Sequence, residues 1–389
     1  MRTSKSPRLP TFTSSAPSTR RGRILRFGGC KKVQKECPGR KTFQKSVEEI
    51  AKGAFDFEAF RNATFLVTGA TGLIGGALVR ALLAANRLRG LGARILAPVR
   101  SLEKAKSVYG EAFYRKEIRF FECDLNVPLE IFEPIDYIVH AASVTQSKIF
   151  VTKPVETIEA AVLSTMNVLA LAKEKSVRGM VYLSSMEAFG VTDPKLEFVT
   201  EKDLGFVDPA SVRSCYPESK RMCENLCAAY AHEYAVPVCA ARLAQTFGAG
   251  VSKEDTRAFM QFAKSAMKGE SIVLHTKGES VGNYVALKDA VNAILLLLIK
   301  GERGEAYTVA GDNTAHPIKE TAKIAAETLS DPPVSIIFDI PEDAMKYGYA
   351  PDVKMHLFNC KLCSLGWRPT MGLKDMFAEL AEDLKDQGI

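Results

Sequence analysis

Residues 64–75 read TFLVTGATGLIG, and this stretch decides the fold. Its first five residues carry no charge and have the length of a short buried strand. The glycines Gly69, Gly72 and Gly75 follow directly, and an apolar helical stretch continues over residues 73–86. Glycine allows a tight turn and a close backbone approach to pyrophosphate, while the helix N-terminus offers N–H groups. We therefore expect a dinucleotide-binding turn here.

The chain around this turn alternates between strand and helix patterns. Further strands are expected at 94–99, 118–121, 137–140 and 179–184, and a long helix at 155–175. Alternation of this kind indicates an α/β fold with a Rossmann-type, doubly wound parallel sheet. An amphipathic pattern predicts a leading helix over 46–60, and shorter elements after about residue 245 predict a smaller C-terminal α/β substrate lobe. We therefore expect an NAD(P)-binding domain over 46–245 and a mainly substrate-binding lobe over 246–389.

The net charge of +7 is concentrated in the first 45 residues, which hold 13 basic residues and one acidic residue. The remainder has 39 basic and 44 acidic residues and is mildly acidic. This distribution argues against a nucleic-acid-binding domain and predicts a disordered basic tail over 1–45. The tail has three interpretations: an organelle transit peptide, an extension without function, or a short arm for a nucleic-acid or membrane surface. We expect a cytoplasmic protein, with organelle import through the tail as the alternative.

Neither a membrane span nor a metal site is expected. The longest apolar run, residues 293–299, is far shorter than the roughly 20 residues that cross a bilayer. The nine cysteines show no repeating frame, and Cys360 and Cys363 form a lone pair with too few neighbouring ligands for zinc. Free thiols in a reducing compartment fit this pattern better.

Tyr216 and Lys220 form a YxxxK motif on a predicted helix, where a spacing of four residues places both side chains on one face. A phenol with a pKa of about 10 is a poor base at neutral pH. A neighbouring ammonium group and a bound oxidised nicotinamide would both favour the phenolate, which would remove a proton from a sugar hydroxyl. A hydroxyl of Ser184 or Ser185, at the end of the predicted fifth strand, would bind the same substrate oxygen, and Glu187 lies in the same loop.

Several motifs occur together in one order: GxxGxxG at 69–75, HAAS at 140–143, SSMEAFG at 184–190, YPESK at 216–220 and KLCSLGWRP at 361–369. Over about residues 62–385 the chain resembles the extended short-chain dehydrogenase/reductase family, which includes nucleotide-sugar epimerases, dehydratases and decarboxylases. The resemblance implies catalytic roles for Ser185, Tyr216, Lys220 and Glu187. It also matches Asn167 to a helix asparagine that helps to hold the lysine and a water, although a plain polar residue is the alternative.

The turn, the strand ends and these motifs together define the expected cofactor site. Its residues are Gly69, Thr71, Gly72, Leu73, Ile74, Gly75, Arg100, Asp124, Leu125, Ala141, Ala142, Ser143, Asn167, Tyr216 and Lys220. Arg100 stands after the second strand, where an acidic residue would bind the NAD ribose and a basic one accommodates the 2′-phosphate of NADP. Arg100 on its own favours NADP, whereas the expected nucleotide-sugar reaction uses bound NAD. We therefore expect NAD as the cofactor and keep NADP as the alternative. Asp124 would accept a hydrogen bond from adenine or cap a helix.

The loop and helix motifs favour one branch of the family. Glu187 matches the glutamate of the decarboxylases and 4,6-dehydratases, but Met186 stands where dehydratases carry an aspartic acid as general acid. The stretch 213–221 resembles the RSCYxxxKR sequence of UDP-glucuronate decarboxylases. The resemblance therefore favours decarboxylation over dehydration.

At two positions that would contact the diphosphate of a nucleotide sugar, this sequence departs from the family pattern. Gln245 occupies the position of a family asparagine that contacts the diphosphate, and we expect it to contact substrate together with Ser185. Gly282 stands where the family commonly has a phosphate-binding arginine. Losing such a charge-assisted contact matters. Either another basic residue serves, with candidates at Lys253, Arg257 and Lys264, or the substrate is not a nucleotide diphosphate.

The expected activity is a lyase or isomerase reaction on a nucleotide sugar through a transient 4-keto intermediate, with UDP-glucuronate decarboxylase preferred. A UDP-hexose 4-epimerase and a 4,6-dehydratase are alternatives within this class. An NADPH-dependent carbonyl reductase and a dinucleotide sensor without activity are alternatives outside it. The family also implies a homodimer formed through the helix face around residues 222–226.

Overall fold

The computed structural model describes residues 35–53, 55–340 and 353–389. Its central sheet has seven parallel strands in the order β11-β6-β5-β4-β1-β2-β3. The strands are β1 (Thr64–Thr68), β2 (Arg94–Val99), β3 (Ile118–Glu122), β4 (Tyr137–His140), β5 (Gly179–Ser185), β6 (Val238–Leu243) and β11 (Ala306–Val309). The five strands expected from the sequence are confirmed, and so is the doubly wound parallel sheet.

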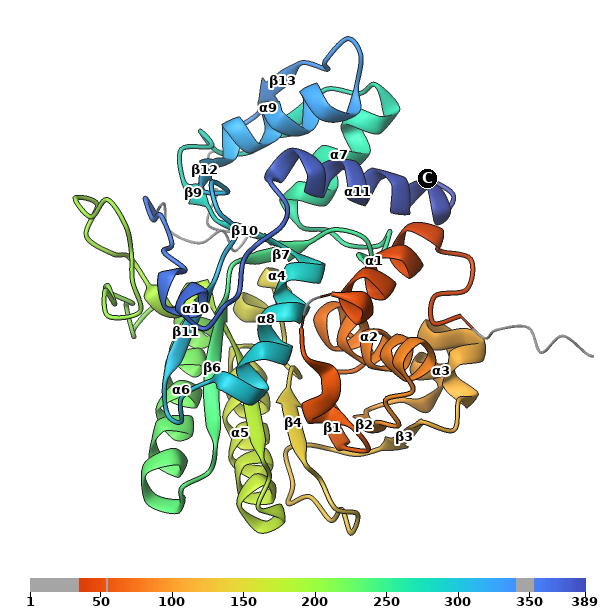
Figure 1. The fold of residues 1–389 in the computed structure, drawn as a ribbon. Coiled ribbons are helices and arrows are strands. Elements are labelled where there is room, and N and C mark those ends of the chain that lie inside the picture. Colours follow the sequence, from red (N-terminus) through yellow and green to blue (C-terminus); the bar gives the residue numbers. More distant parts are fainter. Residues whose placement is uncertain (1–34, 54, 341–352) are drawn as a thin grey trace, which may run out of the picture. The chain divides into compact units, whose positions relative to one another are not determined.

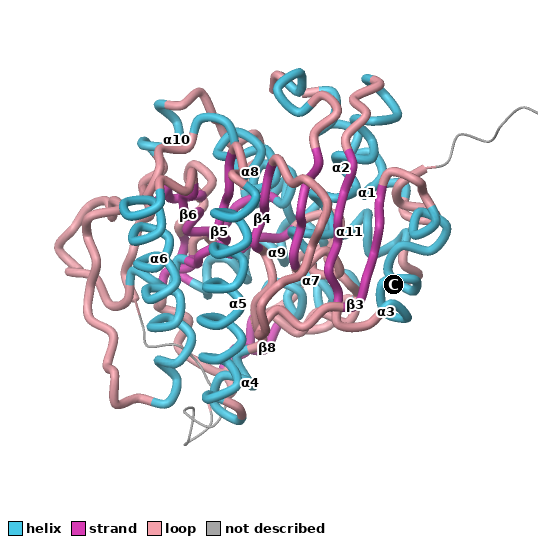
Figure 2. The backbone as a smooth tube through the Cα atoms, turned by 90° about the horizontal axis from the view of Figure 1, so that it is seen from below, coloured by secondary structure: helices cyan, strands magenta, loops and turns pink. Residues whose placement is uncertain are grey.

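Helices cover both faces of this sheet (Figures 1 and 2). The strand β1 is buried along its whole length, and its residues alternate between two cores: Phe65 and Val67 pack with one, Leu66 with the other. The first core includes α1 (Lys41–Lys52), α2 (Leu73–Arg89), α3 (Leu102–Tyr109) and α8 (Leu287–Lys300). The second includes α5 (Pro154–Lys175) and α6 (Cys215–Tyr234). Burial on both faces explains the apolar residues Phe65, Leu66 and Val67 at the centre of β1.

The strand order reverses between β1 and β4. From β1 the chain adds β2 and β3 on one side, and from β4 it adds β5 and β6 on the other. In open parallel sheets, ligands bind beyond the carboxyl ends of the strands at such a switch point. The residues that follow β1, β4 and β5 therefore meet at one edge.

A smaller lobe with its own core follows β6 (Figure 1). It contains three strand pairs, which are β7 (Gln245–Phe247) with β10 (Tyr284–Ala286), β8 (Ile272–Leu274) with β13 (Ile336–Phe338), and β9 (Val281–Gly282) with β12 (His316–Pro317). Its helices are α7 (Ala258–Lys268), α9 (Ile318–Leu329) and α11 (Leu373–Asp386), and the short α4 (Ser147–Thr152) and α10 (Cys360–Ser364) lie outside it. The predicted boundary at residue 245 holds only in part, because α8 and β11 return to the Rossmann sheet.

The prediction of a disordered tail is wrong for residues 35–45. Glu36 is buried and pairs with Arg87 and Arg115, both at 2.7 Å, and Arg40 pairs with Asp383 of α11. The basic composition suggested a solvated segment, but these charges have partners far along the chain. The leading helix expected at 46–60 is instead α1, followed by a 3-10 turn at Phe57–Phe60.

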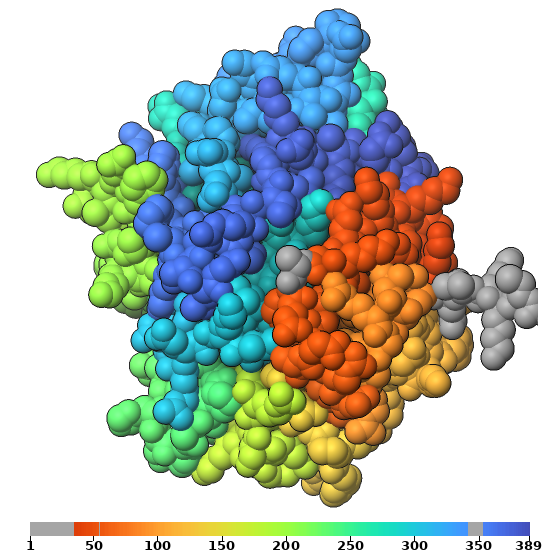
Figure 3. Space-filling model, in the orientation of Figure 1, coloured from red at the N-terminus to blue at the C-terminus, as the bar shows by residue number. Residues whose placement is uncertain are grey.

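This N-terminal segment joins the two parts of the molecule at one surface. In Figure 3 the red residues of α1 border the dark blue residues of α11. The remaining part of the predicted tail, residues 1–34, lies outside the described residues.

By length and composition alone, α5 is able to cross a membrane. Its buried side packs against α6 and the sheet, as expected of a helix that covers a sheet. Val155, Ile158, Leu163 and Met166 leave its outer side apolar and exposed. We therefore assign α5 to the Rossmann fold.

Candidate active site

The glycine-rich turn after β1 admits no side chain at two of its glycines. Gly69 has a φ of +68°, and a Cβ there would lie 2.7 Å from backbone atoms of Ala141 and Ala142. A Cβ on Gly75 would lie 2.5 Å from the Gly69 carbonyl oxygen. Gly72 donates its N–H to the same oxygen at 2.9 Å, which closes the turn. The turn thus requires glycine for the reason expected from the sequence.

The first turn of α2 presents its amides to this edge. Its N-cap, Gly72, provides no side-chain hydrogen bond. Thr71, Leu73 and Ile74 are partly exposed around it. Free N–H groups and the positive end of the helix dipole favour a bound phosphate. The predicted residues of the turn therefore fit the pyrophosphate of a dinucleotide.

Two residues that the sequence did not predict, Tyr109 and Arg80, stabilise the turn. Tyr109 donates its hydroxyl to the Ala70 carbonyl at 2.7 Å. The Arg80 guanidinium lies 4.1 Å from the centre of the Tyr109 ring and donates to Gly76. No local motif marks these contacts, because Tyr109 lies on α3 and meets the turn only in the folded chain.

The ends of β2 and β3 carry the other predicted cofactor residues. Arg100 is exposed directly after β2. Asp124 accepts a hydrogen bond from the backbone N–H of Asn126 at 3.0 Å, so one of its carboxylate oxygens stabilises the loop that contains it. Asn167 donates to the Leu125 carbonyl at 2.9 Å, whereas Lys220 lies elsewhere. The Asn167 amide therefore supports the loop after β3, while Lys220 donates to the Leu183 carbonyl, and the implied role of Asn167 with the lysine and a water stays a prediction.

Tyr216, Lys220 and Ser185 come together as expected. Tyr216 is buried on α6 and stacks on Phe150 with the ring centres 4.3 Å apart. The Ser185 hydroxyl, at the end of β5, hydrogen-bonds to Tyr216 and accepts from the Glu187 amide at 3.2 Å. Lys220 donates to the Leu183 carbonyl at 2.7 Å, which ties α6 to β5.

Burial dominates the electrostatics of this group. It raises the pKa of Tyr216, and the nearby Glu187 carboxylate raises it further, while Ser185, Arg213 and Arg257 oppose this rise. Burial also lowers the pKa of Lys220 to about 8. We expected Lys220 to supply the positive charge that favours the phenolate. The structure adds the guanidinium groups of Arg213 and Arg257, whose effect on Tyr216 the sequence did not predict.

Glu187 lies close to Tyr216 and forms an ion pair with Arg213. Its carboxylate lies 2.9 Å from Arg213, whose guanidinium sits 4.8 Å from the centre of the Phe150 ring. Burial raises the pKa of Glu187, while Arg213 and Lys220 oppose this shift. Arg213 belongs to the stretch that resembles decarboxylases, but the sequence alone did not connect it to Glu187.

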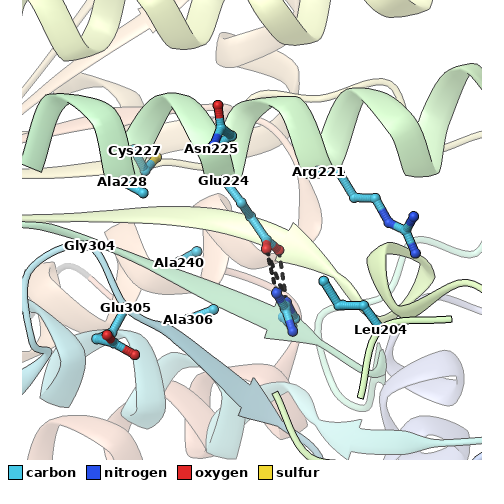
Figure 4. A pocket seen from close by; sticks show the side chains of 11 residues that line it. Leu204, Arg221, Glu224, Asn225, Cys227, Ala228, Ala240, Gly304, Glu305 and Ala306 are labelled. Carbon is cyan, nitrogen blue, oxygen red and sulfur yellow. Dashed lines mark hydrogen bonds and ion pairs between the residues drawn. The ribbon is translucent and has the colours of Figure 1, made fainter. Parts of the chain in front are cut away.

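A second ion pair lies one helical turn beyond Lys220. Glu224 accepts from the Ser184 hydroxyl at 2.5 Å and from Arg242 at 2.7 Å. The pair forms one wall of a pocket of about 340 Å³ between α6, β6 and β11, and Figure 4 shows Glu224 reaching from α6 to this ion pair. The lining of this pocket does not include Tyr216 or Ser185. The pair instead holds the end of β5 through Ser184, which directly precedes the predicted catalytic residue Ser185.

The lobe side of the site explains one departure from the family pattern. A Cβ on Gly282 would lie 2.6 Å from the hydroxyl of Tyr284, which is buried in the lobe core. A larger residue there would have to displace that ring. Gln245 is partly exposed on β7, and its backbone N–H donates to Asn283 at 2.9 Å. No described contact of the Gln245 side chain tests its predicted role with substrate.

Of the three basic candidates, Arg257 is the one whose charge acts on Tyr216. It precedes α7, pairs with Asp255 at 2.7 Å and donates to the Thr246 carbonyl. Lys264 instead donates to the backbone of Lys253. Within the described ranges no three His, Cys, Asp or Glu side chains gather as a metal site.

Comparisons with known sequences extend this description. UDP-glucuronic acid decarboxylase 1 of Xenopus tropicalis is 28% identical over 253 residues, which cover 65% of this chain and only 57% of that protein. UDP-glucuronic acid decarboxylase 6 of Arabidopsis thaliana is 27% identical over 326 residues, which cover 83% of this chain and 89% of that protein.

Solved structures share the fold. A UDP-glucose 4-epimerase of Thermotoga maritima superposes with a TM-score of 0.68 at 19% identity, covering 84% of this chain and all of that one. DesIV of Streptomyces venezuelae, a dTDP-glucose 4,6-dehydratase solved with NAD, has a TM-score of 0.68 at 23% identity, covering 83% of this chain and 97% of that one. The sequence pattern of one family matches residues 65–310, which hold both the glycine turn and the YxxxK motif. The chain therefore belongs to the NAD dependent epimerase/dehydratase family.

Proposed function

We propose that this chain is a UDP-glucuronate decarboxylase that works through a transient 4-keto sugar. The observation that carries the proposal is the Glu187–Arg213 pair, 2.9 Å apart, beside the Ser185 and Tyr216 hydroxyls. It places a carboxylate and a guanidinium next to the base, where the reacting carbon and its carboxyl group would lie. The two relatives named as UDP-glucuronic acid decarboxylases support this choice.

NAD is the cofactor of the family, and the residues of this chain fit it. The Gly69–Gly75 turn leaves no room for a Cβ where pyrophosphate approaches, and α2 offers its N-terminal amides. When bound, NAD supplies a reversible hydride acceptor for C4 of the sugar. Arg100, exposed after β2, keeps NADP as the alternative that a binding comparison would decide.

The residues of the chain then divide the proton chemistry between them. Tyr216, as phenolate, takes the proton of the C4 hydroxyl, and Ser185 donates to the same oxygen as the ketone forms. The C5–carboxyl bond breaks with loss of carbon dioxide, because the 4-keto group accepts the electron pair. C5 then takes up a proton from solvent beside Glu187. Tyr216 gives its own proton back to the C4 oxygen, at the stage where bound NAD would return its hydride to C4.

Two features weigh against the neighbouring reactions. Met186 cannot act as the acid that expels the C6 hydroxyl in a 4,6-dehydratase. A 4-epimerase needs rotation of the keto sugar and gives no role to the Glu187–Arg213 pair. The carbonyl reductase remains as the alternative outside this class, because Gln245 and Gly282 depart from the diphosphate-binding pattern.

The test is to incubate the purified full chain with UDP-glucuronate and NAD, without added reductant. The expected products are carbon dioxide and UDP-xylose, with no net change in NADH. UDP-glucose, UDP-galactose and dTDP-glucose serve as comparison substrates. Turnover of a simple aldehyde or ketone only with NADPH, and of none of the sugar nucleotides, would contradict the proposal.

We further propose a homodimer formed by the outer faces of α5 and α6. Ile158, Met166 and Met222 are exposed on these faces, with relative exposures of 44%, 43% and 50%. Large exposed apolar side chains on adjacent helices are typical of a subunit interface. Light scattering should give twice the chain mass, and Met222→Glu should shift it to the monomer.

The basic N-terminal segment bears on the cellular location of the protein. We propose a cytoplasmic protein, with import through the basic N-terminal segment as the competing outcome. A fluorescent reporter fused after residue 34 and imaged in cells would distinguish the two.

A further inference from the structure

Four buried side chains link β1, β4 and α5 beneath the cofactor edge. The His140 ring lies at the end of β4, with Nδ1 2.8 Å from the Thr68 hydroxyl at the end of β1. Its Nε2 lies 3.3 Å from both the Ser164 and the Thr165 hydroxyls of α5. All four side chains are at most 2% exposed. This histidine has no assigned role in the proposed reaction.

The hydrogen bonds around this ring allow one tautomer. The Thr68 oxygen accepts from the backbone N–H groups of Ala141 and Ala142, both at 3.1 Å, so both of its lone pairs are used. Its own hydrogen must therefore point to Nδ1 of His140, which acts as an acceptor. The imidazole proton is consequently on Nε2.

The other side of the ring agrees with this assignment. Ser164 donates its hydroxyl hydrogen to the Ala160 carbonyl at 2.5 Å, and Thr165 donates to the Ala161 carbonyl at 2.7 Å. Their oxygens are thus free to accept from Nε2–H. The chain of donors runs in one direction, from the Ala141 loop through Thr68 and His140 into α5.

The two amides held by Thr68 belong to the cofactor site. Ala141 and Ala142 form the loop after β4, and their backbone atoms lie 2.7 Å from the Cβ position of Gly69. Thr68 itself directly precedes Gly69. The same hydroxyl therefore sets the spacing between the glycine turn and the facing loop, which together form the walls of the dinucleotide site.

We propose that His140 is a positioning residue for NAD: its Nδ1 lone pair orients the Thr68 hydroxyl so that this oxygen holds the Ala141 and Ala142 amides at the cofactor site. Without an acceptor at Nδ1, the Thr68 hydrogen would have to turn toward one of the two amides. That amide would lose its partner, and the loop would move away from the turn.

The surroundings of the ring keep it neutral, as this role requires. Burial, together with the positive charge of Lys220, lowers the pKa of His140 to about 3. A protonated ring would present a hydrogen to Thr68 instead of a lone pair. The low pKa preserves the acceptor throughout the neutral range.

The experiment is a calorimetric titration of the nucleotide-free full chain with NAD. Asparagine places an oxygen near the position of Nδ1, whereas glutamine places its donor near Nε2. We expect His140→Asn to keep the dissociation constant of NAD within about threefold, and His140→Gln to weaken binding at least tenfold. Thr68→Val, which is isosteric but lacks the hydroxyl, should match His140→Gln, and the double variant should be no worse than either.

Thr165→Val is the matched control, because it alters the Nε2 side only and should leave NAD affinity unchanged. Melting temperatures measured without NAD separate positioning from stability. A His140→Gln variant with parental NAD affinity and only a lower melting temperature would overturn the proposal. So would equal losses in the Asn and Gln variants, or a parent chain that binds no NAD. These readouts do not depend on which sugar nucleotide is turned over.

Discussion

Replacing Glu187 by glutamine should lower the pKa of Tyr216, the proposed base. The Glu187 carboxylate is, after burial, the next largest cause that raises the pKa of Tyr216. A negative charge nearby disfavours the phenolate, so its removal favours the ionised form. Arg213 would also lose its carboxylate partner, and its uncompensated charge acts in the same direction.

The size of this shift follows from the exposure of the pair. Charges within contact distance shift a pKa by about 1–3 units. The Glu187 side chain is 28% exposed and already paired with Arg213, so solvent and the guanidinium screen part of its charge. We therefore expect a shift of about one unit, at the low end of that range.

The assay follows the first half-reaction as the rise of NADH absorbance in single turnovers with UDP-glucuronate between pH 5.5 and 9.5. The base acts only when ionised, so the rate is lost as the pH falls through its pKa. For Glu187→Gln this acid limb should move to lower pH by about one unit. Later steps should slow, so reduced cofactor should accumulate.

Two control variants make the result specific. Glu187→Asp keeps the charge and should leave the acid limb near that of the parent. Glu218→Gln removes a more exposed carboxylate from α6, the helix that carries Tyr216. This carboxylate lies near Arg221, and its removal should not move the acid limb. An acid limb that stays in place, or that moves to higher pH, would refute the assignment of Glu187 as the charge that opposes ionisation of Tyr216.

Three further outcomes are expected. Tyr216→Phe should abolish carbon dioxide release while NAD titration shows an affinity within about threefold of the parent, since only the hydroxyl is lost; an active variant would remove Tyr216 from the role of base. Gly75→Ala should abolish NAD binding in the same titration, because its Cβ would lie 2.5 Å from the Gly69 carbonyl oxygen and only a backbone shift relieves that contact. Removing residues 1–34 should leave the melting temperature unchanged. Removing residues 1–45 should lower stability by about 3–5 kcal/mol, because the buried Phe43 side chain is lost and Arg115 keeps only Glu117 as an ion-pair partner; equal melting temperatures for the two truncations would contradict the structure.

The Rossmann half was predictable from the sequence because its signals are local. Strands buried on both faces are uninterrupted apolar runs, and β1 reads as one directly. The glycine turn is equally local, since Gly69 and Gly75 meet backbone atoms that allow no side chain. Tyr216 and Lys220 lie one turn apart on a single helix, so their spacing alone brings them together.

The errors share a different cause, which is pairing over long distances in the chain. The basic residues before α1 suggested a disordered tail, yet Arg40 pairs with Asp383, more than 340 residues away. Asn167 lies on the expected helix, but its hydrogen bond to the Leu125 carbonyl, 42 residues away, was not expected. Arg213 stood in a recognised motif, but its partner Glu187 comes from another loop. Composition and spacing carry no information about such partners.

The residues of the smaller lobe, and not only those of the Rossmann domain, determine which substrate is bound. At position 282 a larger side chain would displace the buried Tyr284 hydroxyl, so the chain has aromatic packing where the family commonly places a phosphate-binding guanidinium. Arg257 is the cation of the lobe whose charge acts on Tyr216, and it already pairs with Asp255 at 2.7 Å. A diphosphate bound there would have to compete with that carboxylate for the guanidinium. Because the charge of Arg257 opposes the rise in the pKa of Tyr216, a diphosphate that paired with Arg257 would weaken this effect and raise that pKa.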